Sequence, residues 1–384
     1  MRISQQTVTF TPAPMIFNVI SHILSWRDRL RGNRFLNIVI KSGVVALLFA
    51  VLYRDLSENR NLPAVWETFV AHLEGARWGL LALVVLLMPF NWLAETEKWR
   101  QFVARYQPFS RIKAILAVMT GVTFSLFTPN RVGEYGGRML YVQPEHQWKA
   151  VVANLVGNFC QYMVLLGGGV AGGLYIIHHF HLIDITTGYV MVILAGLGFW
   201  VMLGIYYYLE FVIDFIKQRG LLRPIWPWIG RLQLGVIRQF TRQERFGILG
   251  WAIVRYFIYA TQYFLLLRFF GIHTDILSGF AGIAGLFLLQ TSIPLPPLAG
   301  LVARGNMAVL LWEQFGANEI AALAATFTLW VINLVLPALI GTFSFVHVNI
   351  AKSLGYDEST DAAPLAPVAV GTAEPPGAEG TAKH

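Results

Sequence analysis

Long runs of apolar residues, separated by short polar segments, follow one another along most of the chain. About six of these runs reach the roughly 18–20 residues that a helix needs to cross ~30 Å of hydrocarbon. They lie near residues 36–53, 78–97, 151–177, 188–212, 247–268 and 319–345. The pattern predicts an all-α polytopic membrane protein with about six full transmembrane helices.

Two further apolar stretches, residues 114–128 and 276–293, are shorter and run directly into proline segments. The first leads into Thr128-Pro129-Asn130, and the second leads into Pro294-Leu295-Pro296-Pro297. Irregular backbone at membrane depth is tolerated only where it is buried in protein or lines a wet cavity. We therefore expect two re-entrant or broken helices.

The distribution of basic residues supports this topology, because Lys and Arg stay preferentially on the cytoplasmic side. Basic segments follow the second span, at residues 98–113, and the fourth span, at residues 213–246. Both segments lie inside only if 114–128 enters the membrane and returns to the side it came from. Both termini are then cytoplasmic, and two broken segments entering from opposite faces suggest an inverted repeat.

Three regions follow from this topology. Residues 1–35 form a basic cytoplasmic N-terminal segment, residues 36–347 form the transmembrane domain, and residues 348–384 form a disordered cytoplasmic tail rich in Ala, Pro and Gly. Within the domain, 213–246 is a basic amphipathic cytoplasmic loop. It lies either on anionic lipid headgroups or as a solvated loop against neighbouring helices.

Composition argues against a soluble globular domain, a disulfide-bonded domain and a nucleic-acid-binding protein. The chain is 56% hydrophobic and 13% charged, with a mean hydropathy of +0.56, whereas soluble domains carry about 25% charged residues. A single cysteine, Cys160, allows no internal disulfide. The net charge of +8 lies in loops between apolar runs, so it reflects topology and anionic headgroups, and we expect no nucleic-acid partner.

The densest polar cluster spans residues 128–138, directly after the first short apolar stretch. Its charged residues are Arg131, Glu134 and Arg138, and the planar fork of arginine binds phosphate oxygens in a bidentate manner. We interpret the cluster as a lipid headgroup site, in which Glu134 balances an arginine or binds a cationic headgroup. The alternative is a structural ion pair, Arg131–Glu134 or Glu134–Arg138. The residues that shape the backbone here are Pro129, Gly133, Gly136 and Gly137.

A second cluster follows the other short stretch. Gln290 precedes the proline segment and Arg304 follows it, with a lipid-facing role for Arg304 or an ordinary outer loop as the alternatives. The backbone residues of this cluster are Pro294, Pro296, Pro297 and Gly300.

The two clusters together resemble the transmembrane region of the lysylphosphatidylglycerol synthase family, the flippase-like integral membrane proteins. The resemblance rests on Pro-x-Arg-x-Gly-Glu with a second arginine and on the segment Ile293 to Arg304, and it covers most of residues 36–347. It implies a membrane-embedded half that moves modified lipid between leaflets, without the soluble aminoacyltransferase domain. The chain departs from the family pattern at Gly305, where glutamate is common, and at Leu298-Ala299-Gly300, where a double glycine is common.

Polar residues inside the predicted spans form a third group. Asn154, Asn158 and Gln161 recur at helical spacing, and such groups bond between helices or line a path. Arg255 needs a partner in the membrane, for which Glu210, at the end of the preceding span, is the candidate. The candidates for a polar cavity are therefore Asn154, Asn158, Gln161, Arg255 and Gln290.

No nucleotide-binding, hydrolase or metalloprotease motif is present. His178, His179 and His181 lack the spacing of a closed ligand set, so we expect neither a metal nor a cofactor.

The leading hypothesis is a non-enzymatic protein of a prokaryotic plasma (inner) membrane that binds an anionic or phosphate-bearing lipid and translocates it. One alternative is a membrane-embedded transferase acting on a phospholipid or polyprenyl-linked substrate, with Glu134 as its base. Another is an accessory subunit of a separate lipid-modifying enzyme. The sequence gives no oligomeric state.

Overall fold

In a computed structural model, the described part of the chain folds into helices without any β-strand. The structure describes residues 61–346 apart from 74, 76, 127, 129–130, 181–183, 220–239 and 293–299, together with residues 42, 43, 46, 50 and 348. The segment 1–35, almost all of the span 36–53, most of the basic loop and the tail beyond 348 lie outside the described residues. The all-α membrane fold predicted from the sequence is confirmed.

Among the described residues, four stretches are long and apolar enough to cross a membrane: Trp78–Val103, Pro144–His179, Thr186–Tyr207 and Glu319–Val346. They correspond to four of the predicted spans. The predicted span 247–268 lies within the longer helix α11, and helix α3 was not predicted. In chain order the α-helices are α3 (Leu62–Leu73), α4 (Trp78–Val103), α5 (Arg111–Ser125), α6 (Gly133–Met139), α7 (Gln147–Phe180), α8 (Ile185–Tyr207), α9 (Leu209–Arg219), α11 (Arg242–Phe269), α12 (Ile276–Ser292), α13 (Leu301–Trp312), α14 (Glu319–Trp330) and α15 (Leu336–Val346).

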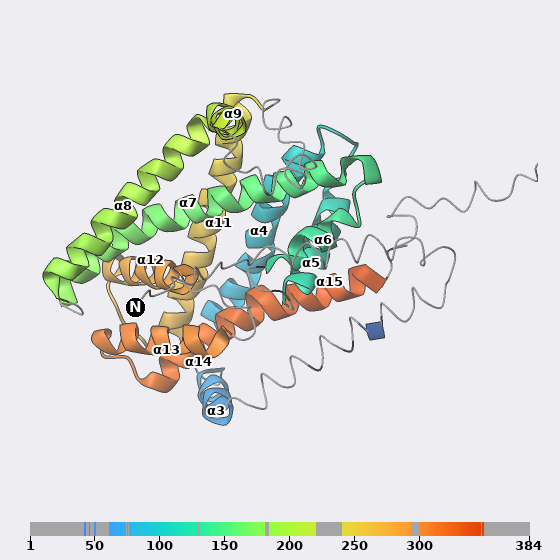
Figure 1. Ribbon diagram of the computed structural model, residues 1–384. Helices are drawn as coiled ribbons and strands as arrows, with labels where there is room; N and C mark the ends of the chain where they lie inside the picture. The colour runs from blue at the N-terminus through green and yellow to red at the C-terminus, as the bar shows by residue number, and fades with distance from the viewer. Residues whose placement is uncertain are drawn as a thin grey trace, which may run out of the picture.

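Helices α4 and α11 pack against each other in antiparallel directions at the centre of the bundle (Figure 1). The amide of Gln262 in α11 donates to the carbonyl of Val84 near the start of α4, at 2.9 Å. At the other end, Arg105, just after α4, pairs with Glu244 in the first turn of α11. This central pair separates the two short-helix segments, which lie on either side of it.

The first short segment is a helical hairpin. Helix α5 has 15 residues, about 22 Å of helix, which is too short to cross the hydrocarbon core. The following helix α6 runs back along it, with Gly137 against Gly121 and Gly133 against Phe124. The backbone N–H of Gln143 then donates to Gln107, which precedes α5, at 3.0 Å. The chain therefore returns to the end of the bundle from which it entered, as predicted.

The second short segment has the same design. Helix α12 has 17 residues, about 25 Å, and α13 returns along it. The side chain of Gln290 donates to the carbonyl of Arg304 at 3.3 Å. A methyl group added to Gly282 would stand 2.9 Å from the ring of Trp312, at the far end of α13.

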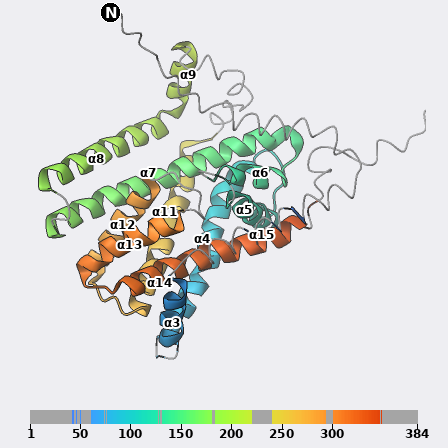
Figure 2. The same cartoon turned by 60° about the horizontal axis from the view of Figure 1, so that its bottom comes forward.

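The two hairpins also pack on equivalent partners. Hairpin α5–α6 lies against α15, and hairpin α12–α13 lies against α7, on opposite sides of the α4–α11 pair (Figure 2). Both contacts are antiparallel and close: a methyl group on Gly341 would meet the carbonyl of Met119 at 2.0 Å, and one on Gly172 would meet that of Ala281 at 2.4 Å. This correspondence is the arrangement expected of an inverted repeat.

Basic side chains gather at the end of the bundle where α4 ends and α7 and α11 begin. Arg105 pairs with Glu244, and the ammonium group of Lys149 lies 4.6 Å from the ring centre of Tyr106. Hydrogen bonds from Arg105 and from Thr241 lower the pKa of Glu244 to about 2, so this carboxylate stays ionised at neutral pH. We refer to this end as the basic end.

Closure of the first hairpin requires glycine at position 137. A methyl group there would stand 2.7–2.8 Å from backbone atoms of Gly121 and Thr120, whereas one on Gly136 would meet nothing within 4 Å. We expect Gly137→Ala to lower the free energy of unfolding by about 1–3 kcal/mol and Gly136→Ala to leave it unchanged or slightly raised. Thermal unfolding of both variants in detergent measures this, and equal stability of the two would contradict the close packing.

Candidate functional site

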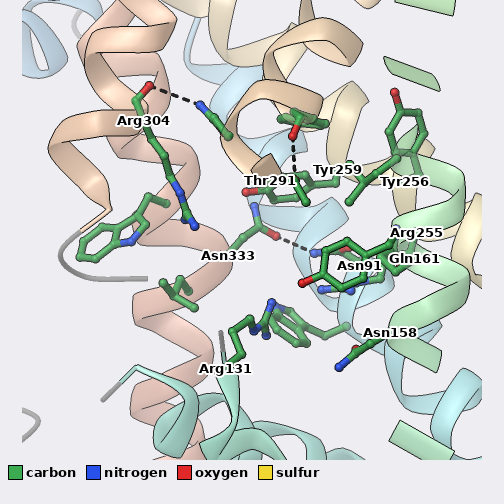
Figure 3. A pocket seen from close by; sticks show the side chains of 17 residues that line it. Asn91, Arg131, Asn158, Gln161, Arg255, Tyr256, Tyr259, Thr291, Arg304 and Asn333 are labelled. Atoms are coloured by element: carbon green, nitrogen blue, oxygen red, sulfur yellow. Dashed lines mark hydrogen bonds between the residues drawn. The ribbon is translucent and has the colours of Figure 1, made fainter. Parts of the chain in front are cut away.

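A cavity of about 300 Å³ lies between the two hairpins and the central helix pair. Figure 3 shows that its lining side chains come from helices far apart in the sequence, including α4, α7, α11 and α13. The polar residues that line it are Asn91, Arg131, Asn158, Gln161, Arg255, Gln290, Thr291, Arg304 and Asn333.

Three arginines face this cavity. Arg131 comes from the link between α5 and α6, Arg255 from α11 and Arg304 from α13. Arg131 and Arg304 extend into the cavity from opposite sides (Figure 3). Among the described residues, no Asp or Glu lines it, so the charge on the lining is positive.

Arg131 has an unusual backbone. Its φ is +59°, in the left-handed region, and among the described residues it is the sole non-glycine with positive φ. Such a conformation costs free energy and persists only where the surroundings impose it. The guanidinium Nε lies 3.3 Å from Glu134 Oε2, and the side chain remains 36% exposed. The turn thus presents this charge to the cavity.

Behind the cavity wall, one carboxylate holds three cations. Glu95 in α4 contacts Lys98 at 2.7 Å, Arg138 at 2.9 Å and Arg255 at 2.9 Å. The side chains of Glu95, Lys98 and Arg138 are at most 3% exposed. Arg138 also pairs with Glu134. Charges as deeply buried as these need compensation, and the network supplies it between α4, α6 and α11.

Aromatic rings support the same cations. The guanidinium of Arg138 lies 5.5 Å from the ring centre of Trp99, and that of Arg255 lies 5.2 Å from that of Trp92. Such cation–π contacts stabilise a charge that has left water and fix the direction of the guanidinium plane.

The network carries an excess of positive charge. Its cations, together with the third lining arginine, are Lys98, Arg131, Arg138, Arg255 and Arg304, and its carboxylates are Glu95 and Glu134. With their ordinary charges, five cations face two carboxylates. Within the described residues, the cations of this site exceed its carboxylates by three (five minus two), and this net positive charge favours binding of an anion.

The predicted headgroup residues divide into two groups. Arg131 and Arg304 line the cavity, whereas Glu134 and Arg138 lie behind it in the buried network. Of the backbone residues, Gly300 directly precedes α13, and Gly133 and Gly137 close the first hairpin. Pro129, Pro294, Pro296 and Pro297 lie outside the described residues.

The predicted polar cavity residues are mostly brought together. Asn158, Gln161, Arg255 and Gln290 line the cavity, while Asn154 is buried away from it. Among the described residues, the ion-pair partner of Arg255 is Glu95. The side chain of Glu210, the candidate from the sequence, lies outside the described residues. Glu95 is 160 residues distant in sequence, and only the packing of α4 on α11 brings it close.

Several cavity residues were not among the predicted site residues. Asn91 donates to Asn333 at 2.9 Å, and Asn333 lies in a π-helical turn, Val331–Val335, between α14 and α15; such turns are frequent at functional sites. Aromatic residues such as Trp92, Tyr259 and Trp330 also line the cavity. The sequence signal for Asn91 and Asn333 was their place inside predicted spans, and the signal for Glu95 and Lys98 was a pair of charges close to an apolar run, because polar groups within a membrane span are functional candidates.

Within the described part of the chain, no three His, Cys, Asp or Glu side chains gather closely enough to hold a metal ion. His178 and His179 lie at the end of α7, where the ring of His179 stacks on that of Tyr175 with centres 4.1 Å apart.

Comparison with known proteins gives one match. A family model described as "Lysylphosphatidylglycerol synthase TM region" matches residues 38–341, which confirms the resemblance noted from the two sequence clusters. No curated protein and no solved structure matches the chain.

We expect Glu95→Ala to lower the free energy of unfolding by about 3–5 kcal/mol, because it leaves two buried cations, Lys98 and Arg138, and the partly buried Arg255 without their shared carboxylate. Glu244→Ala removes an equal charge from a pair that is about a third exposed and should cost less than about 1 kcal/mol. Unfolding of both variants in detergent measures the difference. Equal losses would show that the network does not hold the helices together.

Proposed function

The chain belongs to the family of lysylphosphatidylglycerol synthase transmembrane regions, and from that premise we propose that it binds a phosphate-bearing lipid headgroup in the cavity and moves it between the leaflets. Membership of the family implies a membrane protein of lipid modification or flipping, with a lipid substrate such as phosphatidylglycerol. Binding and movement of a headgroup by this chain are the steps that we add.

The excess of positive charge around the cavity is the observation that carries the proposal. Among the described residues, three arginines and no carboxylate line the cavity, and each guanidinium offers parallel N–H donors that match the oxygens of a phosphate. A phosphodiester in this place, with its single negative charge, also offsets part of the excess positive charge of the buried network. Because charges are weakly screened away from water, the attraction is stronger here than at a surface.

The position of the cavity supports translocation. Arg131 belongs to the first hairpin and Arg304 to the second, and broken helices that meet around a polar site are typical of transporters. The lining amides, among them Asn158, Gln161 and Gln290, give a headgroup hydrogen-bond partners between the two arginines. The headgroup thereby crosses the apolar layer along a polar wall.

The same geometry favours transport over the transferase hypothesis. Glu134, the residue suggested as the base, is held by Arg131 and Arg138 and does not line the cavity. A base has to reach the proton that it removes, and a carboxylate already paired with two arginines does so poorly.

We assign the basic end of the bundle to the cytoplasmic side of a prokaryotic plasma membrane. The first hairpin returns to this end, and the beginning of α11 meets the end of α4 there, so their Lys and Arg residues share one side, in line with the positive-inside rule. Arg131 then approaches the cavity from the hairpin that enters from the cytoplasm, and Arg304 from the hairpin that enters from outside.

Removal of the two hairpin arginines tests the site. In Arg131→Ala/Arg304→Ala we expect the phosphate-bearing lipid retained by the detergent-purified protein to fall at least about tenfold, because charge-assisted hydrogen bonds to phosphate are lost. Mass spectrometry of the retained lipids measures this. Arg111→Ala is the matched control, because it removes a cation whose side chain is 72% exposed.

Reconstituted vesicles separate movement from binding. A fluorescent phospholipid should cross between leaflets more slowly with the double variant than with the wild type or Arg111→Ala. If all three proteins retain the same lipids and support the same rate, the arginine site is wrong. The unfolding temperature of each variant verifies that it is folded.

A further inference from the structure

One of the cations around the cavity differs in kind from the others. The arginines of the site are Arg131, Arg138, Arg255 and Arg304. A guanidinium stays protonated in proteins, whereas a buried lysine can exist as a neutral amine. Among the cations of this site, Lys98 is therefore the one that can change its charge when a ligand arrives.

Lys98 lies deep in the packing between helices. Its side chain is 1% exposed, and its Nζ contacts Glu95 Oε2 at 2.7 Å. Among the described residues, Glu95 is the sole carboxylate that pairs with it. The aliphatic part of the side chain packs on α7, where a methyl group added to Gly157 would stand 3.3 Å from Lys98 Cε. A neutral amine also donates N–H bonds, so the contact with Glu95 persists when Lys98 loses a proton.

A single oxygen atom connects Lys98 to the cavity wall. Arg255 Nη1 donates to the same Glu95 Oε2, at 2.9 Å, while Glu95 Oε1 accepts from Arg138 at 2.9 Å. A phosphate in the cavity competes for the N–H groups of Arg255 and weakens their hold on Oε2. Oε2 is then freer to stabilise a positive charge on Lys98.

The other groups around Lys98 have fixed charges. Arg138, in α6, and Arg255, in α11, stay protonated. The thiol of Cys160, in α7, is buried, and a thiol in apolar surroundings is uncharged at neutral pH. The charged residues of α5, Arg111 and Lys113, lie in its first turn, and Arg111 pairs with Glu97.

Proton uptake at Lys98 keeps the net charge of the site constant. With Lys98 neutral, four arginines face the carboxylates of Glu95 and Glu134, an excess of two positive charges. A phosphodiester adds one negative charge and a proton on Lys98 adds one positive charge, so the excess stays at two. Without this exchange the empty site would carry an excess of three where the dielectric constant is low and unbalanced charge is costly.

From these contacts we infer that binding of the lipid phosphate is coupled to the uptake of a proton, which Lys98 Nζ holds. The proton comes from the solvent and returns to it when the lipid leaves. The inference rests on the proposed function, since it needs an anionic headgroup in the arginine cavity. Lys98 does not line that cavity and acts on the lipid through Glu95 and Arg255.

Calorimetry in two buffers with different enthalpies of ionisation counts the protons. The probe is dioctanoyl phosphatidylglycerol, whose headgroup does not titrate near neutral pH, and the protein is the full chain in an uncharged detergent. We expect an uptake of roughly 0.3–1 proton per lipid bound. Because the occupied site then carries more protons than the empty one, lowering the pH from about 8.5 to about 6.5 should tighten binding at least threefold.

Two substitutions remove the titrating group. Lys98→Met is always neutral and Lys98→Arg is always charged, so binding to either variant should take up no proton and should lose its dependence on pH. Lys149→Arg is the matched control, because Lys149 lies at the basic end beside Tyr106 and outside the cavity lining. It should keep the uptake of the wild type. The unfolding temperature verifies that each variant is folded.

The outcomes distinguish this inference from the proposed function. If the wild type binds the lipid with the same heat in both buffers, or if either folded variant at Lys98 keeps the uptake, proton coupling at Lys98 is wrong. The arginine site still stands in that case, provided that Arg131→Ala/Arg304→Ala abolishes binding. If the wild type does not bind the lipid at any pH, the proposed function and the inference fail together.

Discussion

The buried carboxylate of Glu95 is the constraint on which the rest of the site depends. It holds cations from three helices, Lys98 from its own helix, Arg138 from α6 and Arg255 from α11. A carboxylate and its partners this deep are stable only together, because each one alone would be an uncompensated charge in a medium without water. The first hairpin therefore has to close against α4, and α11 has to cross α4 at one height. The position of the cavity wall follows from these two conditions.

The two halves of the bundle share a packing plan but differ in charge. Each half places a short hairpin on a long helix through a glycine contact, at Gly341 and at Gly172. The first hairpin carries its arginines beside carboxylates, whereas Arg304 in the second has no ion pair among the described residues. Similar backbones thus give a site with unequal sides. The arginines of the first hairpin are neutralised by carboxylates of the protein, whereas the charge of Arg304 is left for an anionic ligand to neutralise.

The sequence predicted the hairpins better than the site. Proline, glycine and short apolar length mark a broken helix locally, so the segments 114–128 and 276–293 were recognisable. Partners across the bundle were not: the sequence suggested Glu210, at the end of the preceding span, as the partner of Arg255, but antiparallel packing brings Glu95 to it. Gly136 and Gly137 are indistinguishable in a sequence, yet only Gly137 faces backbone. Arg131 and Arg138 also look equivalent in the sequence, but Arg131 lies before α6 with a left-handed backbone and lines the cavity, whereas Arg138 lies within α6 and pairs with Glu95.

The size of the cavity limits what part of a lipid it can enclose. About 300 Å³ is at the lower end of the volumes that hold small ligands, which suits a phosphate with a small headgroup but not two acyl chains. The chains have to remain in the bilayer while the headgroup occupies the protein. Such a division requires a wall that is polar at the headgroup and apolar towards the lipid, and the lining combines arginines and amides with Leu165 and Phe287. Tyr162, which lines the cavity and is 49% exposed, joins the two environments, because a tyrosine has an apolar ring and a polar tip.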